Sequence, residues 1–212
     1  MRKKILLITA IVAASLVCIF VLGFGFFYLS GGRMFYVPTG AMMNTILPGD
    51  RLLGRQFAGE LKRGQVVVVQ YPGDSTYRLG RVIGLPKETI EIRDRFVHVN
   101  GQPLDEERVI VEAEGLDWNE LKEISTEGKG PYRVYYIAGD EGTRPLTDYS
   151  GPLQLPPNAF YVMGDNRDNS EDSRYLGPVP RELIWGEVFM IYFSSTIDGD
   201  ELRWNRTFKR VR

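Results

Sequence analysis

The sequence predicts an all-β body of twisted antiparallel sheets, partly closed into a barrel, preceded by one N-terminal membrane-spanning helix. Three observations support this fold class. An uncharged run from Ile5 to Ser30 follows three basic residues. Short β-branched or alternating runs recur after Pro38, each bounded by turn residues. Beyond the N-terminal run, no helical period is longer than about two turns, and Leu116 to Ile124 is the best short candidate.

The N-terminal run has the length and flanking charges of a membrane anchor. It holds 26 residues, and a helix needs about 20 to cross the hydrocarbon core. Arg2, Lys3 and Lys4 precede it, so the positive-inside rule places the N-terminus in the cytoplasm. We therefore expect residues 1–32 to be a single-pass anchor in the cytoplasmic (inner) membrane, with the main domain, residues 33–212, outside the cytoplasm.

A cleaved signal peptide is the competing interpretation of the same run. Its apolar core would hold about 7–15 residues, whereas here Leu16 to Leu29 stay apolar beyond the small residues Ala13-Ala14-Ser15. Cys18 is a candidate for a lipoprotein-type cleavage site, but Val17 before it is larger than the small residue that such sites prefer. We expect an uncleaved anchor. Because Cys18 is the only cysteine, no internal disulfide is expected.

The sequence after the anchor, residues 33–212, predicts strands separated by turns. The turn signals are Pro48-Gly49-Asp50, Pro72-Gly73 and Asn100-Gly101. The strand candidates are Gln65 to Tyr71, with its run of four valines, Thr89 to Arg93, Phe96 to Val99, and Leu183 to Ser194. Residues at about 101–157 are richer in acidic and turn residues, so we expect a smaller lobe inserted there.

Composition excludes several classes of function. The 212 residues suit one domain plus an appendage, and a net charge of −1 does not favour nucleic-acid binding. No Cys/His cluster has the spacing of a metal site, and no glycine-rich phosphate loop is present. We expect no metal and no cofactor.

The most unusual stretch is the polar loop Gly164 to Arg174. It holds three aspartates, one glutamate, two arginines, two asparagines and two serines. A surface turn with ordinary ion pairs is one interpretation. The density of paired donors and acceptors favours a loop fixed by bidentate hydrogen bonds, with Arg174 paired to Asp172 or Asp165.

This loop, GDNRDNSEDSRYLGPVP, resembles the type I signal peptidases of bacteria, in which it supports the floor of the active site. Two further boxes fit the same family in its order. VPTGAMMNTILPGDRLL, Val37 to Leu53, resembles P-S/T-x-S-M-x-x-T-L-x-x-G-D, and LGRVIGLPKETIEI, Leu79 to Ile92, resembles K-R-V-x-G-x-P-G-D. The resemblance implies the signal peptidase β fold and a membrane serine endopeptidase that removes signal peptides during protein export.

The two residues that carry the family's chemistry are absent. Ala41 stands where the resemblance places the nucleophilic serine, and Gly80 stands where it places the lysine base. A serine hydroxyl needs an adjacent base, and a lysine serves as base only when burial lowers its pKa. Without both groups, only about 10³–10⁴-fold acceleration over water typically remains.

Three other residues are candidate substitutes for the missing serine or lysine. Thr39 resembles an oxyanion-hole donor in the family, and a threonine nucleophile stays an open alternative. Lys87 lies seven residues past Gly80, beyond the turn at Pro86, and reaching the site would need a rearranged loop. His98, the only histidine, lies in an alternating hairpin strand and is expected to be a solvated or cross-strand side chain.

The residues that the resemblance assigns to peptide binding are retained more fully than the two catalytic residues. The resemblance implies an oxyanion pair from the backbone N–H of Ala41 and the hydroxyl of Thr39, and a groove lined by Met42, Val82 and Ile83. In the polar loop, the resemblance assigns a supporting role to Asp165, Asn166, Arg167, Ser170, Asp172 and Arg174. Ser170 resembles the serine that orients the lysine.

Three hypotheses follow. The first is a membrane-anchored protein that binds signal peptides or precursor proteins without proteolysis, with an active homologue or the export machinery as a further partner. The second is a working signal peptidase with a substitute nucleophile such as Thr39. The third is an altered form of an active enzyme, changed to trap substrate.

Overall fold

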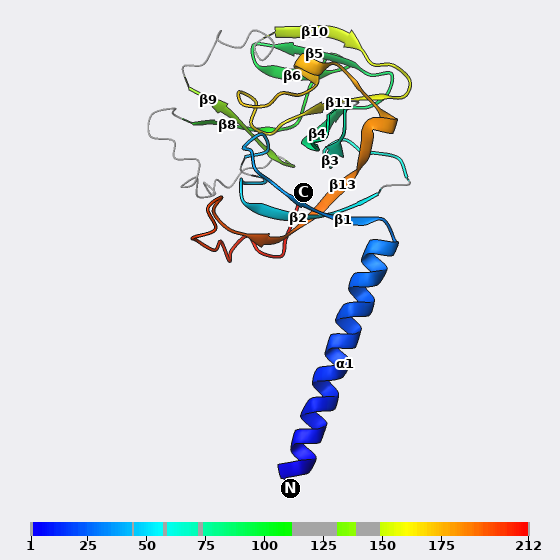
Figure 1. Cartoon of the computed structure of the whole chain (residues 1–212). Coiled ribbons are helices and arrows are strands. Elements are labelled where there is room, and N and C mark those ends of the chain that lie inside the picture. The colour runs from blue at the N-terminus through cyan, green and yellow to red at the C-terminus, as the bar shows by residue number, and fades with distance from the viewer. Residues whose placement is uncertain are drawn as a thin grey trace. The chain divides into compact units, whose positions relative to one another are not determined.

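The computed structural model describes residues 2–43, 45–56, 59–71, 74–111, 131–138 and 149–211. The chain divides into two compact units, Met1–Arg33 and Met34–Arg212. The first unit is mainly one helix, and the second is built mainly of strands (Figure 1). The short helix candidate at Leu116 to Ile124 lies outside the described residues.

The first unit is one helix, α1 (Arg2–Leu29), of 28 residues with none buried. At about 1.5 Å rise per residue it is longer than the roughly 30 Å hydrocarbon core of a bilayer. The hydroxyls of Thr9 and Ser15 donate to the carbonyls of Ile5 and Ile11, one turn earlier, so neither needs water. By length and composition the helix is able to cross a membrane. The expectation of one long apolar helix is therefore confirmed.

The second unit contains a large curled sheet that is mostly antiparallel. Its strand order is β1-β2-β13-β3-β4-β11-β12, and β14 pairs with β13 beside this path. The strands are β1 (Gly32–Tyr36), β2 (Asp50–Gln56), β3 (Val66–Val69), β4 (Arg78–Gly84), β11 (Ala159–Met163), β12 (Val179–Pro180), β13 (Ile184–Ser194) and β14 (Lys209–Arg210). A four-residue helix, α3 (Ser173–Leu176), and a 3-10 turn, η1 (Arg181–Leu183), flank β12.

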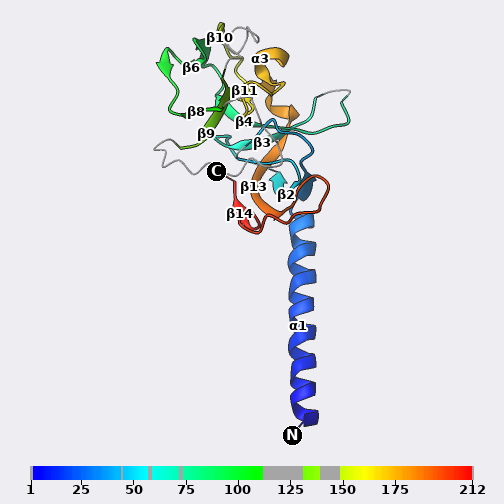
Figure 2. The same cartoon turned by 90° about the vertical axis from the view of Figure 1, so that its left-hand side faces the viewer.

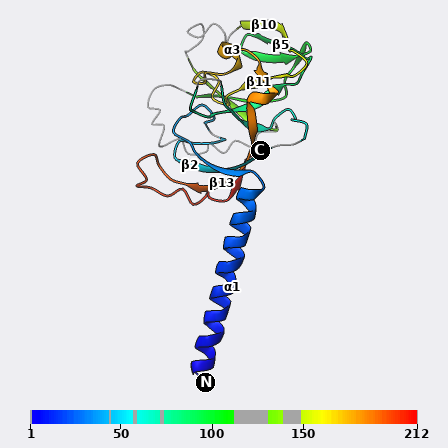
Figure 3. The ribbon, with the colours of Figure 1, turned by 45° about the vertical axis from the view of Figure 1, so that its right-hand side comes forward.

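A second sheet of four strands has the order β10-β5-β6-β7. Its strands are β5 (Thr89–Arg93), β6 (Phe96–Val99), β7 (Gln102–Pro103) and β10 (Tyr149–Gln154), with β10 and β5 side by side (Figure 3). The turn between β5 and β6 has positive φ at Asp94 and Arg95, as a tight hairpin requires. Asn100-Gly101 forms the turn between β6 and β7, as the sequence predicts.

A parallel pair, β8 (Glu107–Val111) and β9 (Arg133–Ile137), completes the body. Residue Tyr135 of β9 forms a bridge with Asn166, so β9 lies beside the loop that follows β11 (Figure 2). The sequence did not predict this pair. A separate lobe at about 101–157 stays a prediction, because much of that range lies outside the described residues.

The packing of β3 explains its unbroken run of valines. Val66 and Val68 enter one core cluster with Met42, while Val67 and Val69 enter another with Val162. All four valines are buried, because the strand is covered on both faces. The predicted buried strand is confirmed, and the strand predicted over Leu183 to Ser194 is confirmed as β13.

Candidate active-site cleft

The first box folds into a loop closed at its base. The Val37 N–H donates to the Asp50 carbonyl at 3.1 Å, and the Gly49 N–H donates to the Val37 carbonyl at 2.8 Å. Gly49 has φ +88°, a conformation that favours glycine. Within the loop, Met42 and Ile46 are buried, so the backbone around Ala41 is fixed from beneath.

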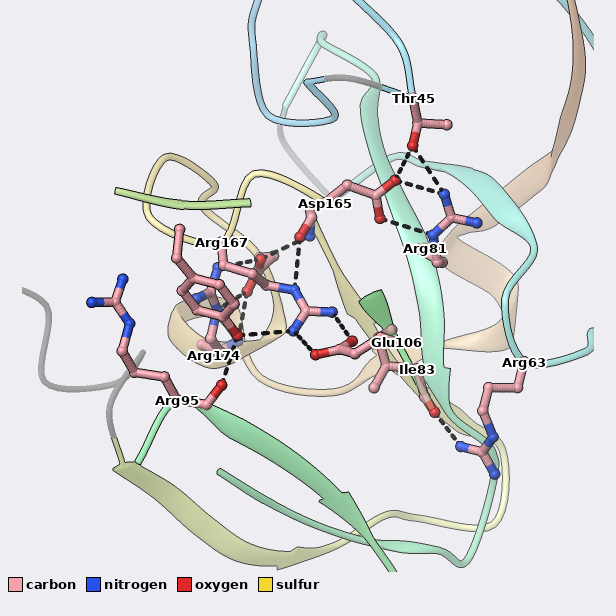
Figure 4. Close-up of polar contacts among 12 residues, drawn as sticks. Thr45, Arg63, Arg81, Ile83, Arg95, Glu106, Asp165, Arg167 and Arg174 are labelled. Carbon is pink, nitrogen blue, oxygen red and sulfur yellow. Dashed lines mark hydrogen bonds and ion pairs between the residues drawn. The ribbon is translucent and has the colours of Figure 1, made fainter. Parts of the chain in front are cut away.

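The second and third boxes meet the first through Asp165. The buried Arg81 of β4 donates to both carboxylate oxygens of Asp165, at 2.8 and 2.6 Å (Figure 4). Burial alone lowers the pKa of Arg81, but the Asp165 carboxylate outweighs it and the net pKa is raised. Thr45, in the first box, donates to the same carboxylate at 2.5 Å. One buried aspartate thus ties the three segments together.

Asn166 makes a second connection between the boxes. Its backbone N–H donates to the Ala41 carbonyl at 3.0 Å, and its side-chain amide donates to the Gly40 carbonyl at 3.1 Å. The third box therefore orients the peptide groups on both sides of Ala41. The side chain of Asn166 supports the loop through backbone contacts, as expected for a scaffold residue.

The polar loop is fixed by buried ion pairs. Arg174 donates to both oxygens of Asp172 at 2.8 Å, and Asp172 also accepts from the Gly164 N–H at 2.9 Å. The predicted pairing of Arg174 with Asp172 is confirmed, whereas Asp165 pairs with Arg81 instead. Arg167 pairs with Glu106 at 2.5 Å, a partner from the predicted insertion that no sequence spacing indicates (Figure 4).

A cleft of about 520 Å³ opens beside this scaffold. Its walls are the extended segments at 35–42 and 76–79, with 169–171 closing one side. Thr39, Ala41, Met42 and Ser170 line it. Val82 and Ile83 are fully buried in two separate core clusters and are not part of this lining, so the groove role expected for them stays a prediction. The Ile83 carbonyl instead accepts from Arg63 (Figure 4).

The charged groups lining this cleft are one ion pair. Arg78 donates to Glu171 at 2.6 Å and to Asp74, outside the lining, at 3.3 Å. No lysine occurs among the described residues that line the cleft. A larger hollow of about 870 Å³ is lined by other residues, including Arg63 and Tyr132, and contains none of the expected site residues. Among the described residues, no group of three metal-ligating side chains comes together.

Known proteins match this chain over most of its length. The family model of signal peptidase, peptidase S26, matches residues 5–193. The chain belongs to the signal peptidase family. Signal peptidase I of Rickettsia typhi is 32% identical over 192 residues, which cover 77% of this chain and 72% of that protein. Signal peptidase I of Rickettsia prowazekii gives the same values.

A solved signal peptidase I from Enterococcus faecalis V583 is also similar. It shares 27% sequence identity, covers 61% of this chain and 97% of its own chain, and has a TM-score of 0.37. Together with the N-terminal apolar helix, the Rickettsia relatives indicate a membrane-anchored member of the signal peptidase family.

In this member of the signal peptidase family, the space beside the α-carbon of Gly80 is too small for a side chain. Gly80 is buried in β4, opposite Val67 of β3. A Cβ atom added there would lie 2.5 Å from Cγ1 of Val162 and 3.4 Å from the Met163 carbonyl oxygen. A real Cβ does not approach another carbon so closely, so a side chain at Gly80 requires Val162 to move.

Two other candidates for the base, Lys87 and His98, are absent from the cleft lining. Lys87 is exposed, has φ +70°, and is not part of the cleft lining. His98 lies on β6 opposite Glu91 of β5, and its Nδ1 is 3.1 Å from the Phe96 carbonyl oxygen. The expected cross-strand position of His98 is confirmed.

Ser170 lies next to Ala41 across Gly164. A Cβ added at Gly164 would contact the Ser170 side chain and would lie 2.6 Å from the Ala41 carbonyl oxygen. Only glycine allows this approach, since any side chain would separate the two segments. The Ser170 side chain is therefore held beside the position that the resemblance assigns to the nucleophile.

Proposed function

We propose that this chain is a membrane-anchored signal-peptidase-like protein that binds the signal peptides of exported precursors without hydrolysing them. The observation that carries the proposal is alanine at position 41, in a cleft that retains the family's supporting loop. A methyl group has no lone pair with which to attack a carbonyl. The cleft keeps its peptide-sized space between two extended segments, which suits an extended ligand.

The surroundings of Gly80 also support a non-catalytic role. The base position has no side chain, and Val162 occupies the adjoining space. The described lining offers no lysine, and Glu171 is already paired with Arg78. A hydroxyl nucleophile needs a base within hydrogen-bond reach.

Among the described residues that line the cleft, Thr39 also has no base beside it that would make it a substitute nucleophile. Its residue is exposed, so its hydroxyl keeps the ordinary weak acidity of an alcohol in water. No partner of the Thr39 hydroxyl is present among the described residues. Thr39 is better suited to donate a hydrogen bond than to attack.

The orientation of the anchor belongs to this proposal as well. Arg2, Lys3 and Lys4 favour a cytoplasmic N-terminus, which places the cleft outside the cytoplasm, in the compartment that receives exported precursors. An active homologue or the export machinery would then share those precursors with this protein.

The test is a purified full-length protein incubated with a precursor peptide that carries an Ala-x-Ala site. We expect binding of the peptide and no product by mass spectrometry. Specific cleavage after the second alanine would refute the non-catalytic proposal. Loss of that cleavage in Thr39→Ala, but not in the distant matched variant Thr89→Ala, would establish the threonine nucleophile instead.

A further inference from the structure

We propose that the preferred ligand of the cleft is a peptide that ends in a free carboxylate, as a signal peptide does after its release. Hydrolysis by an active peptidase breaks the C–N bond, gives the hydroxyl of water to the carbonyl carbon and its proton to the leaving amine of the mature protein, and the new acid ionises to leave this carboxylate on the signal peptide. The inference rests on the proposed function, because it names which form of the signal peptide the cleft selects.

The first observation is a set of backbone donors without acceptors. Among the described residues, none accepts a hydrogen bond from the backbone N–H groups of Thr39, Gly40, Ala41 or Met42. All four residues line the cleft. Unpaired backbone N–H groups on a segment that lines a cleft are donors available to an anionic acceptor.

The second observation is Ser170, an independent donor on the opposite segment. Its residue is only 7% exposed and lines the same cleft. Its hydroxyl has no hydrogen-bond partner among the described residues. The Ser170 Oγ is not among the fully buried unpaired atoms, so it is accessible from the cleft and is able to donate to an acceptor that a ligand supplies.

The number and kind of donors select a carboxylate over an amide. An internal peptide carbonyl offers one oxygen to the Thr39–Met42 segment, whereas a carboxylate offers two, so its second oxygen is able to accept from Ser170. A charged acceptor also makes hydrogen bonds roughly twice as strong as a neutral one.

The proposed attraction comes from neutral donors rather than from a free cation. Arg78 is the cation in the described lining, and Glu171 and Asp74 already neutralise it. Mobile ions screen exposed charges strongly but screen buried hydrogen bonds much less. The preference for a carboxylate is therefore expected to persist in high salt.

The experiment compares three peptides with one signal-peptide sequence ending in Ala-x-Ala. The first ends in a free acid, the second in an amide, and the third continues past the site. Binding to the full-length protein in detergent micelles is measured by fluorescence anisotropy at low and high salt. We expect the acid to bind at least about tenfold more tightly than the amide, the effect of one charged hydrogen bond.

Variants locate the preference in the cleft. Ser170→Ala is expected to weaken binding of the acid more than binding of the amide, and so to reduce the acid-to-amide ratio several-fold. Thr39→Val, which removes the Thr39 hydroxyl, should act in the same direction. Thr89→Val, on β5 away from the cleft, is the matched control. Melting temperatures identify a variant that fails to fold, and the comparison of acid with amide on the unaltered chain does not depend on any variant.

Each outcome decides between the proposals. Equal affinity for acid and amide, or tighter binding of the extended peptide, would overturn the carboxylate preference and leave signal-peptide binding standing. Absence of binding by all three peptides would overturn the proposed function itself. A preference that Ser170→Ala leaves unchanged would overturn the assignment of Ser170 as a donor.

Discussion

At the scale of single residues, the α-carbon of Gly80 and the side chain of Val162 share a space that is too small for one more carbon atom. The two strands that carry them, β4 and β11, are hydrogen-bonded neighbours, so neither retreats independently. Val162 is β-branched and stiff at χ1, unlike a long flexible side chain that turns aside. The base position is therefore occupied by a neighbour as well as lacking its own side chain.

We predict that restoring the two missing residues is insufficient for cleavage. Ala41→Ser with Gly80→Lys should remain inactive on an Ala-x-Ala peptide and should melt at a lower temperature, because overpacking costs about 1–3 kcal/mol. Adding Val162→Ala should raise the cleavage rate at least about 10²-fold over the double variant, the contribution of a general base. Products are read by mass spectrometry.

Val188→Ala supplies the matched control for that experiment. Val188 is a valine of β13, 4% exposed, and packs in a different core cluster. Added to the same double variant, it should give no cleavage. Cleavage by the double variant at the rate of the triple variant would show that Val162 is no obstacle.

At the scale of elements, hydrophobic periodicity and turn residues predicted the strands but not all of the strand pairings. The valine run of β3, the alternation of β5 and β6, and the long apolar β13 all follow from local patterns. The parallel pairing of β8 with β9 brings together residues on either side of a long intervening segment, and no local signal encodes it. Resemblance located Ala41 and Ser170, but the pairs Arg81–Asp165 and Arg167–Glu106 emerge only from tertiary folding.

The polar loop behaves as one element, and this yields a stability prediction. Asp172 caps α3 through the Arg174 N–H at 3.2 Å, holds the Arg174 guanidinium, and accepts from Gly164. Arg174→Ala leaves this buried carboxylate without its counter-ion, which typically costs about 3–5 kcal/mol. We expect a clearly lower melting temperature, whereas the exposed control Arg210→Ala should be neutral. Equal melting temperatures would mean that the loop does not depend on this pair.

A second element-scale prediction separates scaffold from ligand contact. Asp165 links Arg81 of β4 to Thr45 of the first box, while its own carboxylate is buried away from solvent. Asp165→Asn keeps the shape but removes the buried negative charge that pairs with Arg81. Both melting temperature and peptide affinity should fall, whereas Thr45→Val should lower both less, because the ion pair remains. Full affinity in a destabilised Asp165→Asn protein would show that the three boxes need not be joined for binding.

At the scale of the whole molecule, the charge difference between the two ends of α1 favours one orientation across the membrane, and with it one compartment for the cleft. The helix carries its basic residues, Arg2, Lys3 and Lys4, at one end, and its length exceeds the thickness of a bilayer core. Arg33, just past the other end, is a single charge against three. We predict that a reporter fused after Arg212 is active only if it functions outside the cytoplasm.

Replacing Arg2, Lys3 and Lys4 with glutamine should make the orientation mixed, because the charge bias between the two ends is then lost. The matched control, glutamine at Lys62, Lys87 and Lys209 in the body, removes the same charge without affecting orientation. Activity of a cytoplasm-only reporter on the unaltered chain would place the cleft on the wrong side for exported precursors, and the proposed function would fall with it.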